Sequence, residues 1–464
     1  MKAKSLFLFF IIFILSALGQ QQKINDKTLD SASFLGALKK SKIQVHLRNF
    51  FSQTTNEGKL SDYFANAIGS QVHLKTGNYK GFELQIKGSA GFNLISSDLS
   101  QKDSMANAYN RYEVGLFDQQ NFSNKWKIYR LDELSLSYQN KSGKYFLGRQ
   151  MIQTPLINAQ DGRMTPTLVS GIWIEQAILK QLKFKGGLIN RLSPRGTTTF
   201  FKPGESIGIY GQGVNPSGLP HQFYGNVDLP FLFVSSLQFT PTKFIKYQGW
   251  DYHLPGLLNA TFHQLDIYQS SSDFIWLNSA QVMREWALID SENLDPSISY
   301  ISKGSKALTY GFQSKLIFPN WNYSVNYNRI TAEGRYLFPR EWGRDPFFTF
   351  MPRERNEGFG DVHAFVLKIE NQNNQSIFKK SGVAFGYFQL PDVKNFMLNK
   401  YGMPSYFQFN LDLRVNLSNW MQGLEGQLLL VTKLGAAETY NNPKYQFNKV
   451  NMLLTNFVLN YHFK

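Results

Sequence analysis

The stretch YFQFNLDLRVNLSNW at residues 406–420 alternates strictly between apolar and polar side chains, and this alternation decides the fold. Six apolar residues occupy every second position: Phe407, Phe409, Leu411, Leu413, Val415 and Leu417. Successive side chains of a β-strand point to opposite faces, so the segment presents one apolar and one polar face. Six consecutive apolar positions exceed the usual strand of a globular sheet and suit a tilted strand that crosses a membrane.

Similar alternation recurs along the chain, in segments that begin near residues 43, 82, 308 and 323. In residues 257–268 the apolar phase slips, as it would at a β-bulge. Aromatic residues make up 15% of the chain although the mean hydropathy is −0.30. This balance is typical of barrel walls with lipid outside and water inside, and a carbohydrate-binding β-sandwich would also fit it. We predict an antiparallel transmembrane β-barrel of roughly 18 strands, with 16 and 20 as alternatives.

Residues 1–19 have the three parts of a signal peptide. Lys2 and Lys4 precede an apolar run at residues 6–15, and the small residues Ala17 and Gly19 predict cleavage after Gly19. The apolar run is too short to span a bilayer, and no later stretch reaches the roughly 20 apolar residues of a membrane helix. The chain contains no cysteine, which is compatible with an oxidising compartment entered without disulfides. We therefore expect an exported protein in the outer membrane of a Gram-negative cell.

The predicted organisation places a short N-terminal segment at residues 20–42 and the barrel over residues 43–464. Long outer loops are expected near residues 96–128, 193–228 and 333–359, which lack periodicity. The segment at 20–42 is too short to fill a lumen, so we expect no separate plug domain. The chain finishes on an alternating, aromatic-rich strand that includes Phe457, Tyr461 and Phe463. Such a strand resembles the one by which the barrel-assembly machinery recognises outer-membrane barrels.

The sequence gives no support to catalysis or to a bound metal or cofactor. Residues 204–208 fit the G-x-S-x-G elbow of serine hydrolases, but Pro203 precedes them and a stretch rich in glycine and proline follows, so the required helix cannot start. The seven histidines include no pair at metal-ligand spacing. The formal net charge of +16 comes from scattered basic residues. In an exported chain, this charge favours a positive pore or contacts with anionic lipid heads over nucleic-acid binding.

Residues 145–171 combine a strand with a loop punctuated by Thr-Pro and Asp-Gly pairs. Tyr145, Leu147 and Arg149 would share one strand face, and an arginine in phase with lipid-facing residues suggests that the strand has reached the rim or has bulged inward. One interpretation places Arg149 and Arg163 at a constriction of the pore. The alternative is an ordinary surface loop with salt bridges.

At these residues the chain resembles the OprD-like outer-membrane porins. The resemblance is carried by HLRNFF at residues 46–51 and by the G-R-Q, T-P, D-G-R-M-T-P and S-G motifs within residues 147–171. It implies a monomeric barrel, with a trimer as the alternative, whose inward-folded loops and basic side chains pass small solutes that often carry a carboxylate. At matching positions it implicates Arg48, Arg149 and Arg163. Strand phase adds three lumen candidates, Lys87, Lys315 and Arg414.

The predicted loop near residues 333–359 contains five arginines and five carboxylates. Equal numbers of the two signs favour internal ion pairs that hold the shape of the loop. Alternatively the loop bends into the mouth of the barrel, where its aromatic residues would pack against the wall. These residues are Phe338, Trp342, Phe347, Phe348 and Phe350.

The leading hypothesis is therefore a porin for passive, selective diffusion of small polar or carboxylate-bearing solutes through a basic lumen. Its expected partners are outer-membrane lipid and lipopolysaccharide, the solutes, and the barrel-assembly machinery. A FadL-like channel for hydrophobic ligands would require an N-terminal hatch and an apolar lumen. A closed structural or adhesive barrel is the third hypothesis, which a liposome-swelling measurement would distinguish from a porin.

Overall fold

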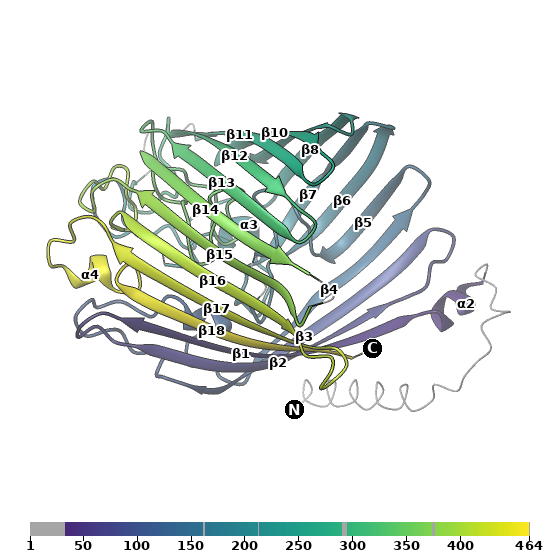
Figure 1. Cartoon of the computed structure of the whole chain (residues 1–464), viewed down its shortest axis with the longest axis horizontal. Helices are drawn as coiled ribbons and strands as arrows, with labels where there is room; N and C mark the ends of the chain where they lie inside the picture. Colours follow the sequence, from purple (N-terminus) through teal and green to yellow (C-terminus); the bar gives the residue numbers. More distant parts are fainter. Residues whose placement is uncertain (1–32, 161–162, 212, 290–294, 374–375, 464) are drawn as a thin grey trace.

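A computed structural model of the chain describes residues 33–160, 163–211, 213–289, 295–373 and 376–463. The predicted signal peptide lies outside these residues. Every strand is antiparallel to its neighbours in one 18-stranded sheet, which closes where β18 pairs with β1 (Figure 1). This closure confirms the predicted barrel and its strand number. None of the helices in the described segments is long and apolar enough to cross a membrane.

The strands follow one another around the barrel in chain order. Their bounds are β1 (Lys42–Asn56), β2 (Tyr63–Lys75), β3 (Phe82–Ser96), β4 (Ile128–Gln139), β5 (Gly143–Gln150), β6 (Leu168–Leu179), β7 (Leu182–Ser193), β8 (Leu232–Thr242), β9 (Ile245–Leu254), β10 (Leu258–Ser270), β11 (Ile275–Ala287), β12 (Lys306–Ile317), β13 (Trp321–Ile330), β14 (Val362–Gln372), β15 (Phe378–Gln389), β16 (Tyr406–Asn416), β17 (Leu424–Gly435) and β18 (Met452–Phe463).

The alternation that predicted the fold separates the two faces of β16. Phe407 and Phe409 are 40% and 47% exposed on the outer wall, whereas Gln408 and Asn410 are buried inside the barrel. The final strand β18 follows the same rule, because Phe457 and Phe463 are exposed outside while Asn456 is buried. The outer wall is therefore apolar, as contact with lipid requires.

The connections divide the barrel into two ends. Short turns join each even-numbered strand to the next odd-numbered strand, and the long connections lie at the opposite end. Helix α4 (Pro443–Gln446) marks the long-connection end at the left of Figure 1, and α2 (Phe34–Lys39) lies at the right. The long connections span residues 97–127, 151–167, 194–231, 288–305, 331–361, 390–405 and 436–451. The sequence analysis named the first three and the fifth of these as loops and did not name the others, which are shorter than the three longest and lack a distinctive composition.

The 331–361 connection folds into the lumen. Its Trp342 is fully buried and packs edge-on against Phe338, which in turn packs against Tyr252 on the inner face of β9. These rings belong to a large apolar cluster that covers the inner faces of the strands from β6 to β15 near the long connections. This part of the barrel interior is packed protein.

This packing explains the phase slip that suggested a bulge in residues 257–268. Strand β10 pairs with β9 and β11 without any shift of register, so the predicted bulge is wrong. Leu258 and Phe262 are buried against the inward-folded connection, while Leu265 and Ile267, which are nearer the other end, are exposed on the outer wall. The apolar face changes side because the strand passes from a packed interior to an open one.

Candidate functional site

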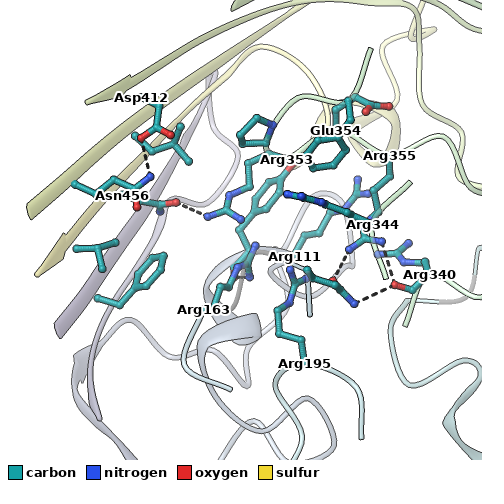
Figure 2. Close-up of a pocket in the computed structure, with 18 of the residues that line it drawn as sticks. Arg111, Arg163, Arg195, Arg340, Arg344, Arg353, Glu354, Arg355, Asp412 and Asn456 are labelled. Carbon is teal, nitrogen blue, oxygen red and sulfur yellow. Dashed lines mark hydrogen bonds between the residues drawn. The ribbon is translucent and has the colours of Figure 1, made fainter. Parts of the chain in front are cut away.

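A cavity of about 360 Å³ lies inside the barrel, between the inward-folded connections and the inner wall formed by β16, β17, β18 and β1. Figure 2 shows that its arginines converge from several connections. The eight lining arginines are Arg111, Arg163, Arg195, Arg340, Arg344, Arg353, Arg355 and Arg414. The lining also includes two carboxylates, those of Glu354 and Asp412. The volume is within the range of pockets that bind small molecules.

The 97–127 connection brings Arg111 and Tyr112 to the cavity by means of a buried carboxylate. Glu113 begins the short helix η1 (Glu113–Leu116) and accepts hydrogen bonds from the hydroxyls of Ser52 and Thr54 on β1, at 2.9 and 2.8 Å. Burial raises the pKa of the Glu113 carboxyl, although these hydrogen bonds oppose the shift. The carboxylate thus fastens the connection to the wall directly before it enters the cavity.

The structure brings together two residues that the resemblance implicated, Arg48 and Arg163. The guanidinium of Arg48 donates to Asn460 on β18 at 2.7 Å and to the backbone carbonyl of Arg163. Arg163 is buried, and its own guanidinium donates to the carbonyl of Tyr112 at 2.6 Å. Arg48 therefore positions the 151–167 connection, and Arg163 joins that connection to the 97–127 connection at the cavity.

The 331–361 connection is held across the lumen by side chains of the opposite wall. Gln408 on β16 donates to the carbonyl of Pro352 at 2.9 Å, and Lys433 on β17 donates to the carbonyl of Arg353 at 2.8 Å. Arg353 itself reaches Asn456 on β18, as Figure 2 shows. These bonds fix the arginines of the connection in the cavity wall.

Neutral groups hold the best-anchored arginines of the cavity. Arg355 donates to the carbonyls of Arg340 and Gly343 and to the side chain of Gln160, at 2.9 to 3.1 Å. The guanidinium of Arg340 lies over the rings of Tyr210 and Tyr401. Carbonyls and rings orient a guanidinium without cancelling its charge.

The arginines are close enough to affect one another. Burial, followed by the positive charges of Arg340 and Arg195, lowers the pKa of Arg355. Like charges in a partly dry site repel one another, and a bound anion relieves that repulsion. The lining thus brings several like charges close together.

Glu354 gives the cavity a dependence on pH. Both of its carboxylate oxygens are buried and have no hydrogen-bond partner among the described residues. Burial and the nearby carboxylate of Asp345 raise the pKa of Glu354 to about 8. Below that pH the side chain is neutral, and above it a negative charge lies near Arg355.

We expect the anion preference of the cavity to fall as the pH rises from 6 to 9, because ionised Glu354 offsets part of the arginine charge. The ratio of anion to cation permeability, measured at both pH values, checks this. The Glu354→Gln variant keeps the side-chain size without the titration and should show a flatter pH profile. An unchanged profile in that variant would assign the titration to another group.

The three lumen candidates from strand phase do lie on the inner face, but each has a carboxylate beside it. Lys87 lies 3.9 Å from Glu133, Lys315 lies 3.8 Å from Glu370, and Arg414 lies 3.1 Å from Asp412. Arg414 also lines the cavity, whereas Lys87 and Lys315 do not. The wall cations therefore contribute less net charge than their number suggests.

Arg149 does not join the cavity, and its placement corrects the expectation of a constriction residue. It follows Leu147, which is 58% exposed on the outer wall, and shares its phase. Its guanidinium lies 4.5 Å from the ring centroid of Phe200 and donates to the carbonyl of Leu131 at 3.3 Å. Strand β5 ends at Gln150 without an inward bulge at Arg149, so the alternation keeps this side chain outside.

The structure decides between the two interpretations of the predicted loop near 333–359. Two of its carboxylates pair outside it: Glu333 lies 2.8 Å from Arg284 on β11, and Glu357 lies 2.8 Å from Lys400 in the 390–405 connection. Glu341 accepts from the backbone N–H groups of Gly208 and Tyr210. The connection therefore bends into the barrel, where three of its five acids contact other segments while Asp345 accepts hydrogen bonds from Tyr336 and Asn356 of the same connection. Four of its five arginines line the cavity.

The serine of the G-x-S-x-G match is buried and makes hydrogen bonds that hold neighbouring segments together. Ser206 is buried in α3 (Pro203–Ser206), where its hydroxyl donates to the carbonyl of Pro203 and accepts from the indole of Trp342, both at 2.7 Å. Within the described residues, no group of three His, Asp or Glu side chains is placed to hold a metal ion.

Comparison with known proteins identifies the architecture. No protein-family model and no curated protein sequence matches the chain. Solved structures match it: OpdK of Pseudomonas aeruginosa, determined with vanillate, has a TM-score of 0.68 at 11% identity, with 92% of this chain and 99% of that chain covered. OccAB4 of Acinetobacter baumannii has a TM-score of 0.69 at 13% identity, with 91% and 98% covered.

A third structure, OccD3 (OpdP) of Pseudomonas aeruginosa, has a TM-score of 0.68 at 11% identity and covers 93% of each chain. All three are OprD/Occ porins, which are channels of the outer membrane rather than enzymes. The resemblance noted in the sequence is thus confirmed in the fold.

Proposed function

We propose that this chain, which has the fold of the OprD/Occ porins, is an outer-membrane channel for passive diffusion of small anionic solutes. The observation that carries the proposal is the cavity lined by eight arginines beside two carboxylates. An arginine fork pairs bidentately with a carboxylate, and several such sites in series let an anion enter without trapping it. Aromatic and aliphatic carboxylates of small size are the solutes this cavity fits.

The neighbouring structures support this choice of solute class. OpdK was determined with vanillate, an aromatic carboxylate, and its fold covers almost all of this chain. A FadL-like channel for hydrophobic ligands fits the cavity less well, because guanidinium groups dominate its lining. We include in the proposal a monomeric barrel whose β18 is the strand recognised by the assembly machinery and whose residues 1–19 are removed on export.

Reconstitution into planar bilayers tests the proposal. We expect stepwise conductance in potassium chloride, and we expect benzoate to reduce the chloride current more than the matched neutral amide, benzamide. The carboxylate competes for the arginines, whereas the amide lacks the charge to do so. The absence of conductance steps would favour a closed barrel, and equal effects of benzoate and benzamide would contradict selection by charge.

A further inference from the structure

The outer wall carries two arginines whose charge the solute path does not use. Arg149 on β5 and Arg191 on β7 both lie opposite Ser170 on β6, so the three residues form one row across neighbouring strands. Strands in a sheet are about 4.8 Å apart, which places the backbones of the two arginines roughly 10 Å from each other. Ser170, which lies between them, has a small side chain.

A bulge turns Arg191 toward the membrane. The pairing of β6 with β7 shifts register between Ser170 and Gly171, and the extra residue on β7 is Asn190. Ile189 and Leu192, on either side of the bulge, are both buried inside the barrel, whereas Asn190 and Arg191 are exposed. The bulge thus presents two consecutive polar side chains on the outer wall.

Glycines fix the backbone on which the row is built. Gly148 has a φ of +113°, and a Cβ there would lie 2.3 Å from the carbonyl oxygen of Leu134. Gly171 is the residue paired with Gly148, and a Cβ on it would lie 2.0 Å from the carbonyl oxygen of Leu188. Any side chain at either position would push the strands apart, so these glycines allow the close packing of β4 to β7 beneath the row.

Other outward cations near the long connections have built-in counter-charges. Arg284 and Lys306 both approach Glu333, at 2.8 and 4.0 Å, and Arg329 lies 2.5 Å from Asp361. Among the residues described, no carboxylate pairs with Arg149 or Arg191. Arg149 donates one N–H to the carbonyl of Leu131 and stacks on Phe200, and its other N–H groups make no hydrogen bond to the described residues.

An uncompensated arginine on a lipid-facing wall costs free energy unless the membrane supplies an anion. The row lies near the ends of β5 and β7 that lead into long connections, which in outer-membrane barrels is the outer side. The anions available at that level are the phosphates of lipid headgroups. Arginine recognises phosphate with paired, charge-assisted hydrogen bonds, and Ser170 and Asn190 add neutral donors.

We infer that the row Arg149, Ser170 and Arg191, with Asn190, is a binding site on the outer wall for the phosphate of an outer-leaflet glycolipid. The site is separate from the solute cavity and does not depend on what the channel conducts. Its occupant would bridge β5 and β7 across β6, and so strengthen the wall where the short strand β5 ends early.

Binding of fluorescent lipid A to the purified, folded full chain tests this inference. We expect wild type to bind bisphosphorylated lipid A more tightly than the dephosphorylated lipid. We expect the double variant Arg149→Gln/Arg191→Gln to bind the phosphorylated lipid about tenfold more weakly than wild type, which is the loss expected when charge-assisted hydrogen bonds are removed. The matched control Lys87→Gln/Lys315→Gln removes two charges from the inner wall and should bind as wild type does.

Several outcomes would overturn the inference. They are wild-type affinity in the double variant, equal binding of the dephosphorylated lipid, and complete displacement by millimolar inorganic phosphate, which would indicate a free-anion site. If the double variant fails to fold, Arg191→Gln decides the question. The exposed side chain of Arg191 makes no hydrogen bond or ion pair with the described residues, so this variant should fold, and its affinity for the lipid should still fall. Conductance of the Arg149→Gln/Arg191→Gln and Arg191→Gln variants should match wild type, which separates this test from that of the channel.

Discussion

Replacing Arg111 and Arg344 with glutamine should lower the ratio of chloride to potassium permeability by roughly thirtyfold, because each unit charge next to the proposed solute path is worth roughly 1 kcal/mol near water, or about fivefold. Both arginines line the cavity. Arg344 stacks on Phe350 and Arg111 lies against Tyr112, and among the described residues neither guanidinium makes a hydrogen bond that the substitution would break. The change should therefore alter charge and leave the connections in place.

Zero-current potentials in a salt gradient measure this effect directly. The control Lys87→Gln/Lys315→Gln removes the same charge from wall positions that already have carboxylates at 3.9 and 3.8 Å. It should change the permeability ratio much less than the cavity variant does. Equal changes in the two variants would show that total lumen charge, rather than the arginine cavity, sets the preference.

Replacing Lys400 with methionine should release the 331–361 connection from the lumen. Lys400 and Glu357 are both almost fully buried, with 2.8 Å between the ammonium and the carboxylate, and the hydroxyl of Tyr401 donates to the same carboxylate at 2.6 Å. Burial opposes ionisation of Glu357, but the neighbouring Lys400 and Arg340 lower its pKa overall. Removing one partner of a buried ion pair costs about 3 to 5 kcal/mol, because the other charge stays buried.

The expected result is a larger single-channel conductance and protease cleavage within residues 331–361, with the barrel itself still folded. The double variant Lys400→Met/Glu357→Gln removes both charges and should recover much of the wild-type conductance. Wild-type conductance and protease resistance in Lys400→Met would contradict the role of the pair as the fastening of this connection.

The strands of the barrel wall could be predicted from the sequence, because the alternation of apolar and polar side chains can be recognised within each short segment. The alternation in residues 406–420 predicts which side chains of β16 face outward and which face inward. The exposed and buried side chains from Phe407 to Asn410 match this prediction. The apparent bulge in β10 failed for a physical reason. Apolar residues of a strand face the lipid only where the interior of the barrel is open. Where the 331–361 connection fills the interior, the apolar residues of β10 face inward instead.

The cavity could be predicted only in part. Strand phase placed Lys87, Lys315 and Arg414 on the inner face. The carboxylates beside Lys87 and Lys315 are on other strands, so identifying them requires the strand register, whereas Asp412 lies two residues before Arg414 on the same strand. Arg111 and Arg195 lie in connections without periodicity, so no local signal directs them inward. Arg149 is in phase with lipid-facing residues, which we interpreted as a rim position or an inward bulge at a constriction. The strand has no bulge at Arg149, so its side chain stays on the outer face.

The zero-current potential of the wild-type channel across a tenfold gradient of potassium chloride tests the central claim most directly. A cavity lined by eight arginines beside two carboxylates predicts a potential whose sign reports preferential passage of chloride. A potential of the opposite sign, or none, would contradict the assignment of the arginine cavity as the selective part of the channel.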